Sequence, residues 1–148
     1  MKSEPDVYSF EQLKKDQTTW WTGVRNYQAR NYMMNQMKLG DLVLFYHSNA
    51  EPPGVAGLAK VTSLAKPDPT QFDKKSEYFD PKSKVDKPSW FCVEVGFFQD
   101  LKNYLPLQTL RDDKKLSGLV LLQKGSRLSV LPVEKKHFDH IVLLGQKN

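Results

Sequence analysis

Apolar residues along this chain follow two spacings, one typical of helices and the other of strands. Over residues 25–37 an apolar side chain recurs every four positions, with Tyr32 alongside, which predicts a helix with one buried stripe. The stripe is formed by Ala29, Met33 and Met37. A shorter helix is predicted over residues 10–15, because Ser9 and Gln12 make a capping-box pattern at its start.

Three further segments have the character of strands. Residues 42–47 form a continuous apolar run, which predicts a strand buried on both faces. Residues 54–61 predict a second strand, in which Gly57 marks a bulge or a close approach of the backbone. Residues 90–98 alternate and therefore have two distinct faces. One face is Phe91, Val93, Val95 and Phe97, and the other is Trp90, Cys92 and Glu94.

The rest of the chain is less regular. Residues 66–89 hold four prolines among many lysines and aspartates, and a loop of this length inside a compact domain indicates a functional flap or a mobile excursion. Short helical turns are expected over residues 107–111 and 113–122, and a late strand over residues 128–131. A terminal helix over residues 134–143 should bury three apolar side chains. These are Phe138, Ile141 and Val142.

The order of these elements predicts the α+β class. Strands and helices are interspersed without regular alternation, which favours a small curled β-barrel of about five to six strands flanked by short helices. At 148 residues, with 39% hydrophobic and 26% charged residues, the chain has the size and composition of one soluble domain spanning residues 1–148. We expect it to be a monomer.

Charge and cysteine content exclude several classes of protein. The formal net charge of +5 permits a polyanionic partner without requiring one, because the lysines are spread along the chain. The single cysteine and three scattered histidines fit no zinc-site spacing, so no metal is expected. No apolar run approaches the ~18 residues of a membrane span, and the first residues lack a signal peptide's hydrophobic region. We therefore expect no membrane contact and a cytoplasmic location, or a nuclear one in a eukaryote.

Residues 20–31 concentrate groups that recognise a nucleobase. The segment holds two indoles, a glycine, two arginines and two asparagines. Such groups stack on a flat ring, hydrogen-bond its edge and hold the adjacent phosphates. Because neighbouring side chains of an extended segment point to opposite sides, we assign Trp20 to the core and Trp21 to a base pocket. Trp90 is a second candidate platform, and packing in the core is the alternative for each indole.

Phosphate contacts are expected at the start of the helix over residues 25–37. Arg25 and Asn26 stand where free N–H groups and the helix dipole favour an anion. Arg30 shares a helix face with Asn26. We therefore assign Arg25 and Arg30 to phosphate and Asn26 to the base edge. The alternative is a solvated face on which Asn26 is a local cap.

Two further polar groups are candidates for reading a base edge. The first is Lys2, Ser3 and Glu4. The second is Tyr46, His47 and Ser48, at the end of a predicted strand. Either group could equally be a polar strand end, and a lone histidine is more often structural than a ligand. The chain contains no catalytic triad pattern and neither glycine-rich phosphate motif, so no catalytic residue and no cofactor are expected.

The order of several motifs closely resembles the EVE domain family. The motifs are Met1-Lys2-Ser3-Glu4-Pro5-Asp6, Trp21-x-Gly23-Val24-Arg25-Asn26-Tyr27-Gln28-Ala29-Arg30-Asn31, Gly40-Asp41, Phe45-Tyr46-His47-Ser48-Asn49, Pro67-Asp68-Pro69-Thr70-Gln71-Phe72, Tyr78-x-Asp80-Pro81-Lys82-Ser83, Pro88-x-Trp90 and Arg127-Leu128-Ser129-Val130-x-Pro132-Val133. They run nearly from end to end. The family usually has an acidic residue after the tryptophan, where this chain has Thr22, and usually a few hydrophobic residues before the first motif, so the first strand should be short.

This resemblance implies a PUA-like fold and a reader of modified bases, chiefly modified cytosine in DNA. The fold is distantly similar to the YTH domain, which binds 6-methyladenine in an aromatic cage. Carried over by motif, Trp21 and Trp90 would be pocket aromatics, and Lys2, Ser3 and Glu4 the floor. The polar rim would be Asn26, Arg30, Tyr46, His47 and Ser48.

Our hypothesis is a protein that binds nucleic acid, DNA or RNA, without altering it. Three rivals remain at this point. A nucleoside or RNA hydrolase would use Lys2 and Glu4 as its reacting groups. An RNA-binding domain would ignore base modification, and a protein-interaction module would not need the pocket at all.

Overall fold

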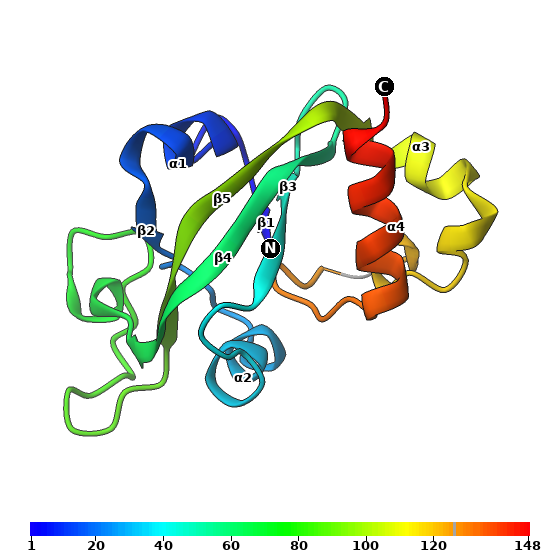
Figure 1. Ribbon diagram of the computed structural model, residues 1–148. Coiled ribbons are helices and arrows are strands. Elements are labelled where there is room, and N and C mark those ends of the chain that lie inside the picture. Colours follow the sequence, from blue (N-terminus) through cyan, green and yellow to red (C-terminus); the bar gives the residue numbers. More distant parts are fainter. Residues whose placement is uncertain (126) are drawn as a thin grey trace.

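One five-stranded mixed sheet organises the fold (Figure 1). The computed structural model describes residues 1–125 and 127–148. The strands lie in the order β1-β3-β4-β5-β2. They are β1 Lys2–Ser3, β2 Thr18–Trp20, β3 Leu42–His47, β4 Gly54–Pro67 and β5 Phe91–Pro106. β1 is parallel to β3 and each other neighbouring pair is antiparallel. Together with the helices, this sheet confirms the α+β class.

The spine of the sheet is the pair β4 and β5, which are longer than the apolar pattern predicted. β4 has 14 residues and β5 has 16. Their register shifts at four places, and each shift adds local twist and bend. The sheet therefore curls as expected. It remains open rather than closed into a barrel, because the described edge strands β1 and β2, of two and three residues, do not pair with each other.

Within the described residues, four helices and three short 3-10 helices pack around the sheet. They are α1 Phe10–Asp16, α2 Tyr27–Asn35, η1 Pro69–Phe72, α3 Leu107–Asp112, η2 Lys114–Leu116, η3 Val120–Leu122 and α4 Lys135–Gln146. Figure 1 shows α3 and α4 together at one end of the sheet, with α1 and α2 toward the other. Among the described residues, no helix combines the length and apolar character needed to cross a bilayer.

Helices form at residues 10–16, 27–35 and 135–146, close to the three longer helices predicted from the sequence, with differences in their bounds and buried faces. The Ser9 hydroxyl accepts the Gln12 N–H at 3.0 Å, so the predicted cap of α1 is confirmed. α2 begins later than predicted, because Asn26 caps it rather than joining it. The buried face of α4 differs from the expected one: it has a spacing of four residues, and Phe138 and Val142 are only partly buried. Its buried residues are His137, Ile141 and Gly145.

The late strand predicted over residues 128–131 is wrong. That segment adds one backbone hydrogen bond to the sheet, from the Lys2 N–H to the Ser129 carbonyl at 2.8 Å. β1 offers only two residues for pairing, and Pro132 has no N–H to continue a ladder. The apolar alternation of the segment therefore serves packing without strand pairing.

Two clusters of buried side chains lie on opposite sides of β3. Phe45 belongs to the first cluster, with Phe10, Trp21 and Met33. Tyr46, the next residue, belongs to the second cluster, which contains residues from α3 and α4. Successive side chains of a strand point to opposite faces, so β3 divides the two clusters. The prediction of a strand buried on both faces is confirmed for its central residues.

Gly57 lies in close contact with the Phe10 ring of the first cluster. The Phe10 ring lies against it, so that an added Cβ would collide with the ring. The same ring lies 5.5 Å from Phe45 and 5.6 Å from Phe97, measured between centroids. The predicted close approach at Gly57 is confirmed, and the register of β4 also shifts beside it.

We expect Gly57→Ala to lower the free energy of unfolding by about 1–3 kcal/mol, because the added methyl overpacks the site. Urea denaturation measures this cost. In a Phe10→Leu background the smaller side chain leaves room for the methyl, and the same substitution should cost less. An equal cost in both backgrounds would show that the collision with Phe10 is not the cause.

Candidate functional site

A cavity of about 670 Å³ opens beside the two adjacent tryptophans. We call it the tryptophan pocket, and its volume lies in the range of small-molecule sites. It is lined by residues from both ends of the chain and from the long loop between β4 and β5. These residues are Lys2, Ser3, Glu4, Val7, Tyr8, Thr19, Trp20, Trp21, Thr22, Gly23, Val24, Ser48, Tyr78, Arg127 and Ser129.

One wall of the pocket is polar and is built on β1. The Lys2 N–H donates to the Ser129 carbonyl at 2.8 Å, and the Ser48 N–H donates to the Ser3 carbonyl at 3.0 Å. Three segments far apart in sequence therefore lie side by side. The Ser3 hydroxyl donates to the Tyr8 carbonyl at 2.7 Å, which fixes the turn after β1.

Another wall is aromatic and is formed by Trp20 and Trp21, at and just after the end of β2. Trp21 is 8% exposed, and its ring stands 5.4 Å from Phe45 at an angle of 83°. Trp20 is partly exposed, with the Lys66 ammonium 3.9 Å from its ring centroid. The assignment of Trp20 to the core and Trp21 to the pocket needs correction. Both line the pocket and Trp21 is the more buried, because β2 is an edge strand and leaves Trp20 near solvent.

Gly23 lets the long loop approach this wall. Its φ is +87°, and an added Cβ would lie 2.7 Å from the Tyr78 ring. Tyr78 thereby reaches the pocket from residues 66–89. The loop thus contributes to the candidate site, as expected of a functional flap.

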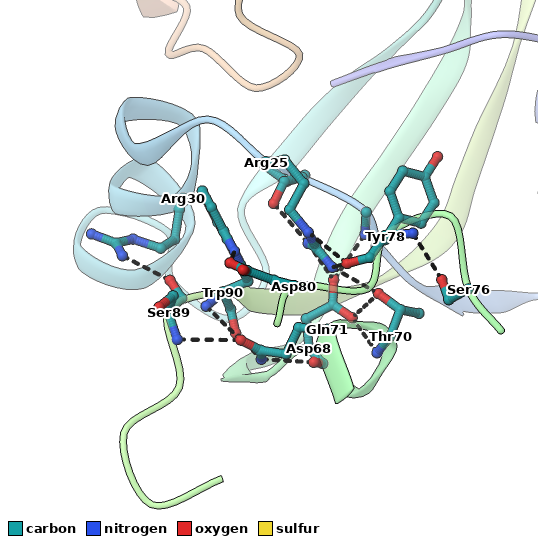
Figure 2. Close-up of polar contacts among 12 residues, drawn as sticks. Arg25, Arg30, Asp68, Thr70, Gln71, Ser76, Tyr78, Asp80, Ser89 and Trp90 are labelled. Atoms are coloured by element: carbon teal, nitrogen blue, oxygen red, sulfur yellow. Dashed lines mark hydrogen bonds and ion pairs between the residues drawn. The ribbon is translucent and has the colours of Figure 1, made fainter. Parts of the chain in front are cut away.

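Gln71 anchors the loop from inside (Figure 2). Its side chain is fully buried, and the amide nitrogen donates to the carbonyls of Asp68 and Trp90 at 2.7 and 2.8 Å. The amide oxygen accepts the Ser83 hydroxyl and the N–H groups of Ser89 and Trp90. One side chain therefore joins both ends of an irregular segment.

Arg25 is not free to bind phosphate. Its guanidinium group makes five hydrogen bonds inside the protein, which equals its number of N–H donors (Figure 2). The acceptors are the Tyr78 carbonyl, twice, the Val24 carbonyl, the Asp68 carboxylate and the Thr70 hydroxyl. The phosphate assignment of Arg25 is therefore corrected: the side chain ties the loop to the start of α2.

Arg30 is also committed within the protein. It donates to the Ser89 carbonyl at 2.7 Å and twice to the Asn31 side chain. Its guanidinium carbon lies 4.7 Å from the centroid of the Tyr27 ring. The predicted phosphate role of Arg30 lacks support, because these contacts hold it beside the loop.

Trp90 lies outside the tryptophan pocket as the described residues define it. It is 6% exposed and stacks on Tyr27, with centroids 4.7 Å apart and planes 17° from parallel. Its indole N–H donates to Asp80 at 2.8 Å. The expectation that Trp21 and Trp90 share one cavity is therefore corrected, since the loop and α2 cover Trp90.

The remaining predicted residues divide between the site and the scaffold. Lys2, Ser3, Glu4 and Ser48 line the tryptophan pocket, as predicted. Asn26 instead caps α2, and Tyr46 packs in the second cluster. His47 accepts the Phe10 N–H at 3.1 Å, and burial lowers the pKa of the imidazole, which favours its neutral form.

Several pocket residues escaped the sequence argument. They are Tyr8, Thr19, Trp20, Tyr78, Arg127 and Ser129. A signal existed for the last two: residues 127–130 alternate, and Leu128 and Val130 pack in the first cluster while Arg127 and Ser129 face the pocket. Tyr78 carried no such signal, because a loop residue has no periodic pattern.

Metal and thiol chemistry find no support in the described part of the chain. No three His, Cys, Asp or Glu side chains gather there to hold an ion. Burial raises the pKa of the Cys92 thiol to about 11, which keeps it protonated and unreactive.

The charged centre that fixes the site is Asp68, which is fully buried. Burial alone would raise the pKa of this carboxyl. Hydrogen bonds from the Thr70 hydroxyl, the Gly23 and Thr70 amides and Arg25 outweigh it and hold the pKa below its ordinary 3.8. The ionised form is therefore favoured by folding, and its stabilisation is present above pH 3.8 and lost as pH falls through the lower folded pKa.

We expect Asp68→Asn to lower the free energy of unfolding by about 3 kcal/mol at neutral pH, since Arg25 loses its buried partner. The difference from the wild type should shrink as pH falls below 3.8. Urea denaturation across pH measures both effects, and Asp86→Asn, an exposed change in the same loop, is the matched control. A loss that is small or independent of pH would contradict the role given to Asp68.

Known proteins are similar to this chain along nearly its whole length. Residues 1–144 match the family model of the EVE domain. Human thymocyte nuclear protein 1 is 42% identical over 166 residues, which cover 99% of this chain and 73% of that protein.

Solved structures agree in fold along nearly the whole chain. A hypothetical protein from Leishmania major superposes with a TM-score of 0.94 at 45% identity, covering 99% of this chain and 92% of that one. The human THYN1 protein in complex with 5-methylcytosine containing DNA superposes with a TM-score of 0.93 at 42% identity, covering 100% and 96%. The match of sequence motifs and fold over the same residues means that this chain belongs to the EVE domain family.

Proposed function

We propose that this protein binds DNA and holds a 5-methylated cytosine in the tryptophan pocket without altering it. The observation that carries the proposal is the relative of 42% identity and TM-score 0.93 whose structure contains 5-methylcytosine DNA. The pocket supports it independently, because its lining combines aromatic and polar side chains. A flat base with a hydrogen-bonding edge matches both walls.

A base must leave its stack to enter such a pocket. Extrusion from a duplex costs on the order of a few kcal/mol. Stacking on an aromatic side chain returns about 1–3 kcal/mol. These two contributions nearly cancel, so hydrogen bonds and phosphate contacts must supply the net affinity. Binding should therefore weaken as salt rises.

The polar wall offers partners for a cytosine edge. The amino group of cytosine is a donor, and the Glu4 carboxylate is the acceptor at the pocket. The oxygen and ring nitrogen of the base accept hydrogen bonds, and the Ser48 hydroxyl and Lys2 ammonium can donate them. These three side chains are the proposed readers of the base.

The 5-methyl group of the base should contribute only a small part of the binding free energy. Burying one methyl-sized apolar group gains about 0.8 kcal/mol, which is about fourfold in affinity. Val7 and Val24 supply apolar surface at the pocket for this contact. We therefore propose a reader that prefers the methylated base by a small factor rather than an absolute one.

A hydrolase is the rival with a specific observation behind it, because Lys2 and Glu4 line the same cavity. It would release a product from a modified nucleoside, and Lys2→Ala would abolish that release. A reader binds and releases the base unchanged. Incubation of methylated DNA with the protein, followed by nucleoside analysis, separates the two.

We expect Trp20→Ala to weaken binding of 5-methylcytosine DNA about fivefold to hundredfold, by removal of a stacking surface. Fluorescence anisotropy with methylated and unmethylated duplexes measures the change. Trp20 is chosen over Trp21, because Trp21 also packs against Phe45 in the core.

Phe98→Ala is the matched control. Phe98 is also an exposed aromatic residue with a lysine, Lys60, over its ring at 5.9 Å, but it lies outside the pocket. It should bind DNA like the wild type. If both variants lost the same affinity for 5-methylcytosine DNA, or if Trp20→Ala lost none, the pocket would be ruled out as the base site.

A further inference from the structure

We infer that the polar wall of the tryptophan pocket contains a subsite for the DNA phosphate next to the bound base, formed by Lys2, Arg127 and Ser129. The inference rests on the proposed function and locates the backbone contact that the affinity of the site requires. The three side chains line the same cavity as the two tryptophans. The Lys2 ammonium has three N–H donors, so it can contact both the base edge and the phosphate. Lys2 and Arg127 are the lysine and arginine among the described residues that line the cavity, so they are the cations available to a phosphate that adjoins the bound base.

The backbone places the two cations on neighbouring segments. The Lys2 N–H donates to the Ser129 carbonyl at 2.8 Å, which joins β1 to the segment before α4. Figure 1 shows this late segment running beside the N-terminus. Arg127 and Ser129 both line the pocket, while Leu128 between them packs against the core. This alternation aims a guanidinium and a hydroxyl into the cavity.

The charges at this wall are unpaired within the described chain. No carboxylate lies within ion-pair distance of Lys2 or Arg127 among residues 1–125 and 127–148. Partial burial lowers the pKa of Lys2. An anion beside the ammonium would oppose this shift by stabilising the charged form. Glu4, the one carboxylate lining the pocket, is close to Asn49, whose amide donates to it at 3.4 Å.

The two arginines that the sequence predicted to bind phosphate donate their hydrogen bonds within the protein instead. The Arg25 guanidinium donates four hydrogen bonds to the loop and one to the Val24 carbonyl, and Arg30 contacts Ser89 and Asn31. Lys2 and Arg127 differ from both in lining the pocket, and they lack an ion pair like the one that joins Arg25 to Asp68. Lysine and arginine in such a position neutralise phosphate and make affinity depend on salt.

The test uses duplexes with one 5-methylcytosine and a single neutral methylphosphonate linkage on its 5′ or its 3′ side. For the wild type, one of the two neutral linkages should weaken binding about tenfold, as loss of a charged hydrogen bond does. Lys2→Gln and Arg127→Gln should each weaken binding to the ordinary duplex. Each should also reduce the salt slope by about 1 and become less sensitive to the neutral linkage.

Lys38→Gln is the control, because it removes one charge from an exposed lysine that lies outside the tryptophan pocket. It should keep the full sensitivity to the neutral linkage. If the wild type binds methylated DNA but tolerates both neutral linkages, the subsite is overturned while the reader stands. Sensitivity that persists unchanged in Lys2→Gln and Arg127→Gln overturns it as well, and absence of any DNA binding overturns both proposals.

Discussion

The buried carboxylate of Asp68 is the interaction on which the site depends. It accepts the Gly23 N–H at 2.8 Å, Arg25 at 3.1 Å and the Thr70 N–H at 2.8 Å. Gly23 and Arg25 follow β2, whereas Asp68 follows β4. A fully buried charge is tolerated only when its hydrogen bonds are satisfied, so these partners must stay together. The aromatic wall of the pocket is held in place as a consequence.

Gln71 extends this constraint across the loop. Its buried amide joins Asp68 to Trp90, near the two ends of the loop between β4 and β5. In the loop, a polar side chain satisfies backbone hydrogen-bonding groups that strand pairing would satisfy in a sheet. Tyr78 is carried to the pocket by a loop that is irregular yet firmly bonded. A long proline-rich segment therefore need not be a mobile one.

The charges of the chain divide into two roles. Arg25 and Arg30, which lie within residues 20–31, donate hydrogen bonds to the long loop. Lys2 and Arg127, near opposite ends of the sequence, face the pocket. The difference follows from the acceptors nearby. Arg25 donates to the Asp68 carboxylate and to the Tyr78 carbonyl, whereas no carboxylate of the described residues lies within ion-pair distance of Lys2. Net charge alone did not distinguish a cation that faces the pocket from one that is held within the protein.

The sequence by itself determined the family, the α+β class, the cap of α1 and the glycine under Phe10. Each depends on local spacing or on an ordered run of motifs. Only the tertiary structure decided that Trp90 and Arg25 serve the loop and that the sheet stays open. The reason is distance along the chain: Arg25 and Asp68 are 43 residues apart, and no periodic pattern reports which side chains such a separation brings together.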